Sequence, residues 1–128
     1  MPMSQKKPLV IVVEDEPFIR LEAETLFEEA GLAVASFHTA DHALAHIEAH
    51  ALEVSVLFTD VQLPGKVNGL DLANLVANSW QWIEVLVTSG QPAGNDARLP
   101  HKARFFPKPW NADEIVTAVQ TALARRIQ

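Results

Sequence analysis

The sequence predicts an α/β protein with one doubly wound domain, in which helices cover both faces of a parallel sheet. Three observations lead to this prediction. Short runs of aliphatic and β-branched residues recur along the chain, and segments with helical apolar spacing separate them. Strands that alternate with helices form parallel sheets with right-handed crossovers. The 128 residues, with 48% hydrophobic and 20% charged content, suit one domain with a buried core.

The first predicted strand is Leu9–Val13, a continuous aliphatic run typical of a strand buried on both faces. Three acidic residues and Pro17 follow it and predict a helix start, since proline suits the first turn and acids suit the helix N-terminus. Gly31 is placed to end this helix. The predicted inner face has apolar residues at helical spacing: Ile19, Ala23, Leu26, Phe27 and Ala30.

A weaker second strand is predicted over Leu32–Phe37, and Thr39 or Asp41 caps a helix that runs to about His50. Histidines recur every four residues along this helix. A solvated surface stripe is the favoured interpretation, because no acidic or thiolate ligand completes a metal site within the segment. A zinc site or a pH sensor is the alternative. The stripe consists of His38, His42, His46 and His50.

The third strand is predicted over Val56–Thr59, and Asp60 closes it. Turn-forming residues follow, and Asn68 is placed to cap a third helix. Trp80 and Trp82 flank the end of this helix, where edge packing is favoured over a binding platform.

A fourth strand is predicted over Ile83–Val87 and ends in Thr88-Ser89-Gly90. Prolines and glycine interrupt the segment Gln91–Arg104, which predicts at most a turn or two there. The last strand is predicted over Ala103–Phe106, and Asn111 with Glu114 three residues later predicts the start of a final helix.

Composition excludes several classes of protein. With 10 basic and 16 acidic residues, the net charge of −6 argues against a nucleic-acid surface. There is no cysteine, so disulfides and thiolate metal sites are excluded. No apolar run approaches a membrane span, and residues 1–8 lack the apolar middle of a signal peptide. We therefore expect a cytoplasmic protein with an N-terminal tail over residues 1–8 and one domain over residues 9–126.

Chemically informative residues fall at or just past the predicted strand ends, which a parallel sheet brings to one edge. Asp60 alone fits two interpretations, a turn residue or a ligand-binding carboxylate. Three carboxylates brought together favour a hard divalent cation such as Mg²⁺. A lysine and a threonine would hold a phosphoryl group, and the pattern predicts Mg²⁺-assisted phosphoryl transfer onto Asp60. The residues concerned are Glu14, Asp15, Asp60, Thr88 and Lys108.

Four motifs in this order resemble the receiver domain of bacterial two-component response regulators. The resemblance runs from about Leu9 to Arg125. Its motifs are Val12-Val13-Glu14-Asp15-Glu16-Pro17, Thr59-Asp60 with Leu63-Pro64-Gly65, Val87-Thr88-Ser89-Gly90 and Phe106-Pro107-Lys108-Pro109. It implies a flavodoxin-like (βα)5 three-layer sandwich with strand order 2-1-3-4-5.

The resemblance also implies roles for individual residues. Asp60 would be the phosphoacceptor, and Lys108 would contact the phosphoryl oxygens. The peptide bond from Lys108 to Pro109 would be cis. Thr88 would be the switch hydroxyl and Phe105 the aromatic residue that repacks with it. Mg²⁺ or Mn²⁺ would be held by Asp15, Asp60 and the backbone carbonyl of Gln62, with Glu14 acting mainly through water.

The implied protein is a signalling switch and not an enzyme, although it assists its own phosphoryl transfer and dephosphorylation. Its partners would be a sensor histidine kinase or a histidine phosphotransfer protein, and a downstream protein that the sequence does not identify. A homodimer is open, and neither nucleic acid nor membrane is expected. No output domain is expected after the last helix, so the chain would be a stand-alone switch, a phosphate sink or an excised domain.

Three features depart from the family pattern. The loop from Asp60 to Gly69 is one residue longer than usual, and the region of the fourth helix is irregular or shortened. Glu14 stands where many relatives carry aspartate, a tolerated variant that is compatible with the metal site. A pseudo-receiver that only binds a partner is the main alternative. A phosphatase of the Asp-x-Asp type lacks its second acid, since Gln62 stands there, and a flavin site is disfavoured because Glu14-Asp15-Glu16 would repel a phosphate.

Overall fold

The computed structural model describes residues 7–90 and 98–125. Five parallel strands form one sheet in the order β2-β1-β3-β4-β5, which confirms the predicted fold and strand order. The elements in chain order are β1 (Leu9–Val13), α1 (Pro17–Glu29), β2 (Ala33–Phe37), α2 (Ala40–His50), the short 3₁₀ helix η1 (Ala51–Glu53), β3 (Val54–Asp60), α3 (Gly69–Ser79), β4 (Glu84–Ser89), β5 (Arg104–Pro107) and α4 (Ala112–Arg125).

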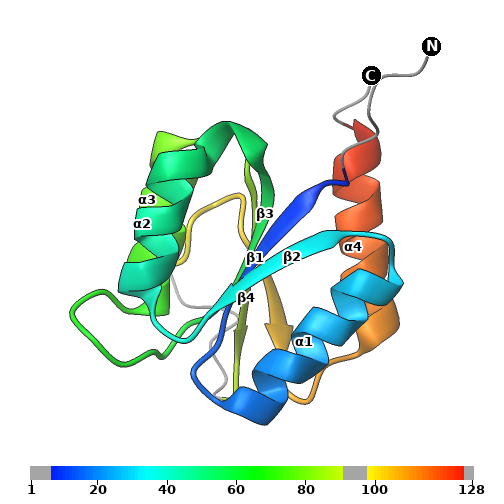
Figure 1. The fold of residues 1–128 in the computed structure, drawn as a ribbon, viewed down its shortest axis with the longest axis horizontal. Coiled ribbons are helices and arrows are strands. Elements are labelled where there is room, and N and C mark those ends of the chain that lie inside the picture. The colour runs from blue at the N-terminus through cyan, green and yellow to red at the C-terminus, as the bar shows by residue number, and fades with distance from the viewer. Residues whose placement is uncertain (1–6, 91–97, 126–128) are drawn as a thin grey trace.

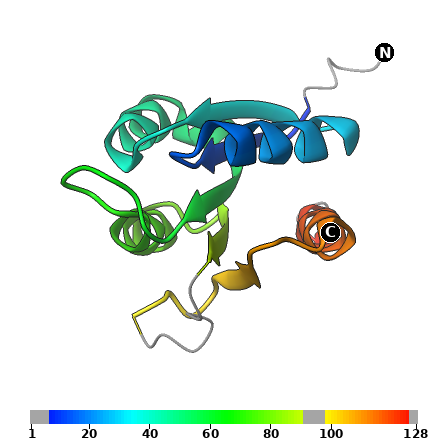
Figure 2. The same ribbon diagram turned by 90° about the horizontal axis from the view of Figure 1, so that it is seen from below.

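The helices lie on both faces of the sheet and make the molecule three layers thick. Helices α2 and α3 cover one face, and α1 and α4 cover the other (Figure 1). The view from below shows the sheet between the two helix pairs (Figure 2). None of the helices in the described ranges is long and apolar enough to cross a membrane.

Alternate residues of the central strands enter two separate cores. In β1, Ile11 and Val13 pack with α2 and α3, whereas Val10 and Val12 pack with α1 and α4. Side chains of a strand point alternately to opposite faces, so a strand between two helix layers must be apolar on both. This requirement explains the largely apolar segments from which β1, β3 and β4 were predicted.

Polar side chains begin the helices where the sequence predicted caps. Thr39 accepts the backbone N–H of His42, and Asn68 forms a reciprocal capping box with Asp71. Glu16, which the sequence had marked only as one of three acids, is the N-cap of α1 and accepts the N–H groups of Phe18 and Ile19. After α1, Gly31 has a φ of +89°, the left-handed conformation that favours glycine at this position.

Four predicted strands differ from the structure at their ends. Strand β3 runs from Val54 to Asp60, so Asp60 is its last residue. Strand β4 extends two residues further than predicted, to Ser89, and begins one residue later. Strand β2 begins one residue later than predicted, and β5 is shifted by one residue and ends at Pro107. Residues 98–103 form turns, as predicted for the irregular segment, and contain no helix. The rest of that segment, residues 91–97, lies outside the described residues.

Candidate functional site

Asp60 lies at the carboxyl end of the central strand β3. The strand register places its Cα opposite that of Thr88 in β4, and Thr88 in turn opposite Phe106 in β5. The side chain of Asp60 is buried, with the residue only 6% exposed. Its Oδ1 accepts the backbone N–H of Gln62 at 3.1 Å, which leaves Oδ2 facing the lysine described next.

Lys108 joins two of the buried carboxylates. Its Nζ donates to Asp60 Oδ2 at 2.8 Å and to Glu14 Oε1 at 2.9 Å. The backbone N–H of Lys108 donates to the carbonyl of Ser89 at 3.0 Å, and the peptide bond to Pro109 is cis, as the resemblance implied. Burial alone would lower the pKa of Lys108, but the hydrogen bonds to Asp60 and Glu14 outweigh it and raise that pKa above 10.5.

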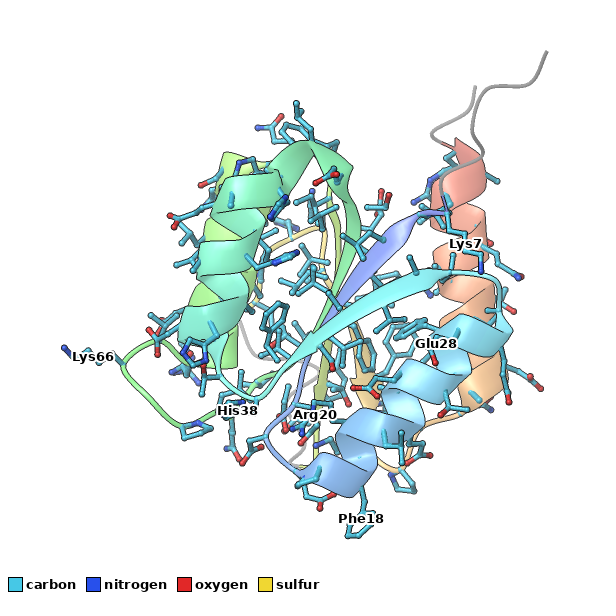
Figure 3. All side chains as sticks on the ribbon, viewed as in Figure 1. Lys7, Phe18, Arg20, Glu28, His38 and Lys66 are labelled. Carbon is cyan, nitrogen blue, oxygen red and sulfur yellow. The ribbon has the colours of Figure 1, made fainter. Side chains whose placement is uncertain are left out.

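Glu14 is held at the end of β1 by its own backbone and by α1. Its N–H donates to Phe37, and its carbonyl accepts the Nη1 of Arg20 at 2.9 Å. Arg20 lies beside the strand ends, whereas Phe18 of the same helix points away from them (Figure 3). Burial raises the pKa of the Glu14 carboxyl above 4.5, although Lys108 and the N–H of Glu16 act in the opposite direction.

Glu14, Asp15 and Asp60 form an acidic cluster. Each offers one carboxylate oxygen, and these oxygens lie within 4.8 Å of one another. Glu14 and Asp60 are buried, while Asp15 is exposed and open to solvent. In the ranges that the structure describes, this is the only group of three or more acidic, histidine or cysteine side chains close enough to share an ion. The donor set consists of hard oxygens and fits Mg²⁺.

The predicted histidine stripe does not form a comparable group. The His46 and His50 rings lie 4.6 Å apart, and His50 Nδ1 lies 2.9 Å from Glu53 Oε1. His38, His42 and His50 are exposed. These features fit the favoured interpretation, a solvated face of α2.

A glycine allows the loop after Asp60 to return close to the strand end. A Cβ on Gly69 would lie 1.5 Å from the carbonyl oxygen of Asp60, so no side chain fits there. The N–H of Gly69 also donates to the carbonyl of Val61 at 3.0 Å. The first residue of α3 therefore lies directly against the backbone of Asp60. Lys66, in the loop between them, extends away from the molecule (Figure 3).

Thr88 is buried beside the cluster and has a partner that the sequence analysis missed. The indole Nε1 of Trp110 donates to Thr88 Oγ1 at 2.6 Å. Trp110 is partly buried, and its ring lies edge-to-face on Phe58. Phe105, the predicted repacking residue, is partly buried and packs on the core under α2 and α3.

Among the other tryptophans, Trp82 donates its Nε1–H to the carbonyl of Ala51 at 3.1 Å, and Trp80 packs against the core, in keeping with the predicted edge packing.

Sequence reasoning also missed Arg20, which donates to the carbonyl of Glu14. A basic residue one turn into the helix that follows the acidic motif was the available signal.

Comparison with known proteins identifies the family. The family model of the response regulator receiver domain matches residues 10–120. The nitrogen assimilation regulatory protein NtrX of Azorhizobium caulinodans is 30% identical over 118 residues, which are 89% of this chain and 26% of that protein. This chain spans 26% to 55% of the length of the curated relatives that it matches.

Solved structures agree. The receiver domain of NtrX from Brucella abortus has a TM-score of 0.77 and 27% identity, over 90% of this chain and 98% of that one. Response regulator protein TrrA from Thermotoga maritima was solved in complex with Mg(2+)-BeF. It has a TM-score of 0.81 over 90% of this chain and 98% of that one, which shows a shared fold at 20% sequence identity. The chain belongs to the family of response regulator receiver domains of two-component systems.

Proposed function

We propose that this chain is a phosphorylatable switch in which Asp60 accepts a phosphoryl group from a phosphohistidine. The contact between Lys108 Nζ and Asp60 Oδ2, at 2.8 Å inside an acidic cluster, carries the proposal. One ammonium cannot neutralise three neighbouring carboxylates, so the cluster has a remaining demand for positive charge. A site built only for stability would be satisfied by one buried ion pair.

In the proposed step, a carboxylate oxygen of Asp60 attacks phosphorus. A P–O bond forms, the P–N bond to the donor imidazole breaks, and the departing imidazole takes up a proton from water. Lys108 offsets the charge on the phosphoryl oxygens, and the hydroxyl of Thr88 donates a hydrogen bond to one of them. Such a transfer depends mainly on position and charge, which these few side chains supply.

Mg²⁺ or Mn²⁺ fits the donor set of the cluster. We assign Glu14, Asp15, Asp60 and the backbone carbonyl of Gln62 to hold it, with Glu14 acting mainly through water. When bound, the ion supplies the positive charge that lets a phosphoryl group approach the carboxylates. The solved complex of TrrA with Mg(2+)-BeF, on the same fold, supports this assignment.

We further propose that phosphorylation shifts Thr88 and Phe105 and so changes the surface that a downstream protein or a second copy of this chain recognises. The phosphoryl donor would be a sensor histidine kinase or a histidine phosphotransfer protein. The receiver unit would be residues 9–126. A chain of this kind either signals through a bound partner or drains phosphate from its kinase.

Intact mass after incubation with acetyl phosphate tests the proposal. We expect wild-type protein to gain one phosphoryl group with Mg²⁺ and none with a chelator. Asp60→Asn should gain none, because an amide is not a nucleophile of this kind. The matched control is Asp113→Asn, which removes an exposed carboxylate in the first turn of α4 and should leave the gain unchanged.

The same experiment addresses the pseudo-receiver. Folded wild-type protein that gains no mass under any of these conditions would contradict the proposed function and make partner binding the whole function. A gain that persists in Asp60→Asn would contradict the assignment of Asp60 while leaving phosphorylation in place.

A further inference from the structure

Trp110 makes two contacts with residues next to the candidate site. Its indole N–H donates to Thr88 Oγ1 at 2.6 Å, and its ring meets Phe58 edge-to-face at a centroid distance of 5.3 Å. Phe58 is buried in β3, two residues before Asp60. The tryptophan thus contacts the two strands that carry the phosphoacceptor and the predicted switch hydroxyl, and it follows the Lys108–Pro109 bond.

The direction of the hydrogen bond has a chemical consequence. An indole N–H can only donate, whereas a threonine hydroxyl has one hydrogen to donate and two lone pairs that accept. A lone pair of Thr88 is therefore used by Trp110, and the hydroxyl hydrogen is left for another acceptor. A phosphoryl group on the neighbouring Asp60 would be such an acceptor, and a chain of hydrogen bonds in one direction strengthens each member.

We propose that Trp110 is a positioning residue for phosphoryl binding, because its indole N–H orients the Thr88 hydroxyl as a donor toward a phosphoryl group on Asp60. This inference rests on the proposed function, since it needs the phosphoryl group there. It extends the site to a side chain that touches none of the reacting atoms.

A second role of Trp110, packing against the core that Phe58 shares with α1 and α4, is separable from this role. A phenylalanine at position 110 would keep an aromatic ring against Phe58 but would lack the N–H donor. Trp110→Phe therefore tests the hydrogen bond and not the packing. Trp82→Phe is the matched control, because it also removes an indole N–H bond, to Ala51 just before β3 begins, far along the strands from Asp60.

The first measurement is titration calorimetry of the full chain with Mg²⁺ alone and then with beryllofluoride in the presence of Mg²⁺. For Trp110→Phe we expect unchanged Mg²⁺ affinity and about three- to tenfold weaker beryllofluoride binding, the size of one hydrogen bond. Trp82→Phe should match wild type in both titrations. Equal or tighter beryllofluoride binding by Trp110→Phe would overturn the proposal, and so would a parallel loss of Mg²⁺ affinity.

A double-mutant cycle with Thr88→Ala separates action through Thr88 from a general structural effect. Trp110→Phe should add no further loss once Thr88 is alanine. An undiminished loss in that background would overturn the proposal. If the wild-type protein does not bind beryllofluoride at all, the proposed function fails, and the inference fails with it. If the wild-type protein binds beryllofluoride and Trp110→Phe binds it equally well, only the inference fails.

The wild-type protein provides a test that needs no variant. The indole N–H resonance of Trp110, assigned by its loss in Trp110→Phe, should shift when beryllofluoride and Mg²⁺ are added, while that of Trp82 should stay in place. An unmoved Trp110 resonance at saturation would contradict the proposed link between the indole and the phosphoryl site.

Discussion

Lys108 balances the charge of the site at the level of single residues. It lies within 2.9 Å of Glu14 Oε1 and within 2.8 Å of Asp60 Oδ2, and its side chain is 19% exposed. Glu14 and Asp60 are the least exposed charged residues in the described ranges. Removing the ammonium would leave two buried carboxylates facing each other, which costs more than the ion pair contributes when intact.

Lys108→Met should therefore lower the free energy of unfolding at pH 8 by roughly 3 kcal/mol. The pKa of Lys108 is raised in the folded state, so its contribution is complete below pH 10.5 and is lost as the pH rises through the higher folded pKa. The gap between wild type and Lys108→Met should shrink above pH 10.5. Urea unfolding followed by circular dichroism measures it, and no tyrosine or cysteine titrates in the same range.

Lys66→Met is the control for this experiment. Lys66 is an exposed lysine on the loop that follows β3, so its replacement should change the free energy of unfolding by less than about 0.5 kcal/mol at either pH. A gap for Lys108→Met that stays constant up to pH 11.5 would contradict the raised pKa.

The sequence could predict which residues approach one another but only part of their bonding. Glu14, Asp15, Asp60, Thr88 and Lys108 were all predicted to meet because parallel strands place their carboxyl ends at one edge. The hydrogen bond from Trp110 to Thr88 joins residues that are not paired by the strand register, and it depends on the orientation of one ring. No periodicity or turn motif encodes such an orientation, so the structure was needed to find it.

At the scale of elements, the loop from β3 to α3 returns close to the backbone of Asp60. Gly69 begins α3, and its Cα lies close to the carbonyl group of Asp60. A Cβ on Gly69 would lie 1.5 Å from the oxygen and 2.6 Å from the carbon of that carbonyl. Both atoms belong to the backbone of a central strand, which cannot move without disturbing its hydrogen bonds to β1 and β4. Gly69 is required for space and not for an unusual φ.

Gly69→Ala should therefore lower the free energy of unfolding by about 3 kcal/mol or more and also slow phosphorylation of Asp60. Gly90→Ala is the matched control, because a Cβ there would meet no atom within 4 Å. Thermal unfolding together with the rate of mass gain from acetyl phosphate measures both effects. A Gly69→Ala protein as stable as Gly90→Ala would show that the loop relaxes away from Asp60.

Element types were predictable for a related reason. Strands β1, β3 and β4 are buried on both faces and α1, α2 and α3 carry their own caps, so local pattern and final environment agree. Boundaries were less predictable, as β3 shows. Its inclusion of Asp60 depends on pairing with Thr88 in the neighbouring strand, which the local sequence does not contain.

At the scale of the whole molecule, folding brings like charges together at the carboxyl ends of the strands, and their repulsion opposes folding. The net charge is −6. Glu14 and Asp15 follow β1 and Asp60 ends β3, so the three carboxylates meet only in the folded sheet. A cation that binds this meeting point binds the native state and not the unfolded chain. Linkage then converts binding into stability.

We expect Mg²⁺ to raise the midpoint of thermal unfolding of the wild-type protein. At a concentration one hundred times the dissociation constant, binding adds about 2.7 kcal/mol, which corresponds to roughly 8 °C for a domain of this size. Calorimetric scans with Mg²⁺ and with NaCl at equal ionic strength distinguish specific binding from screening of the net charge. Asp15→Asn removes the solvent-exposed carboxylate of the cluster and should lose most of the Mg²⁺ shift. An equal shift in NaCl, or a full shift in Asp15→Asn, would show that Mg²⁺ stabilises the protein without using this site.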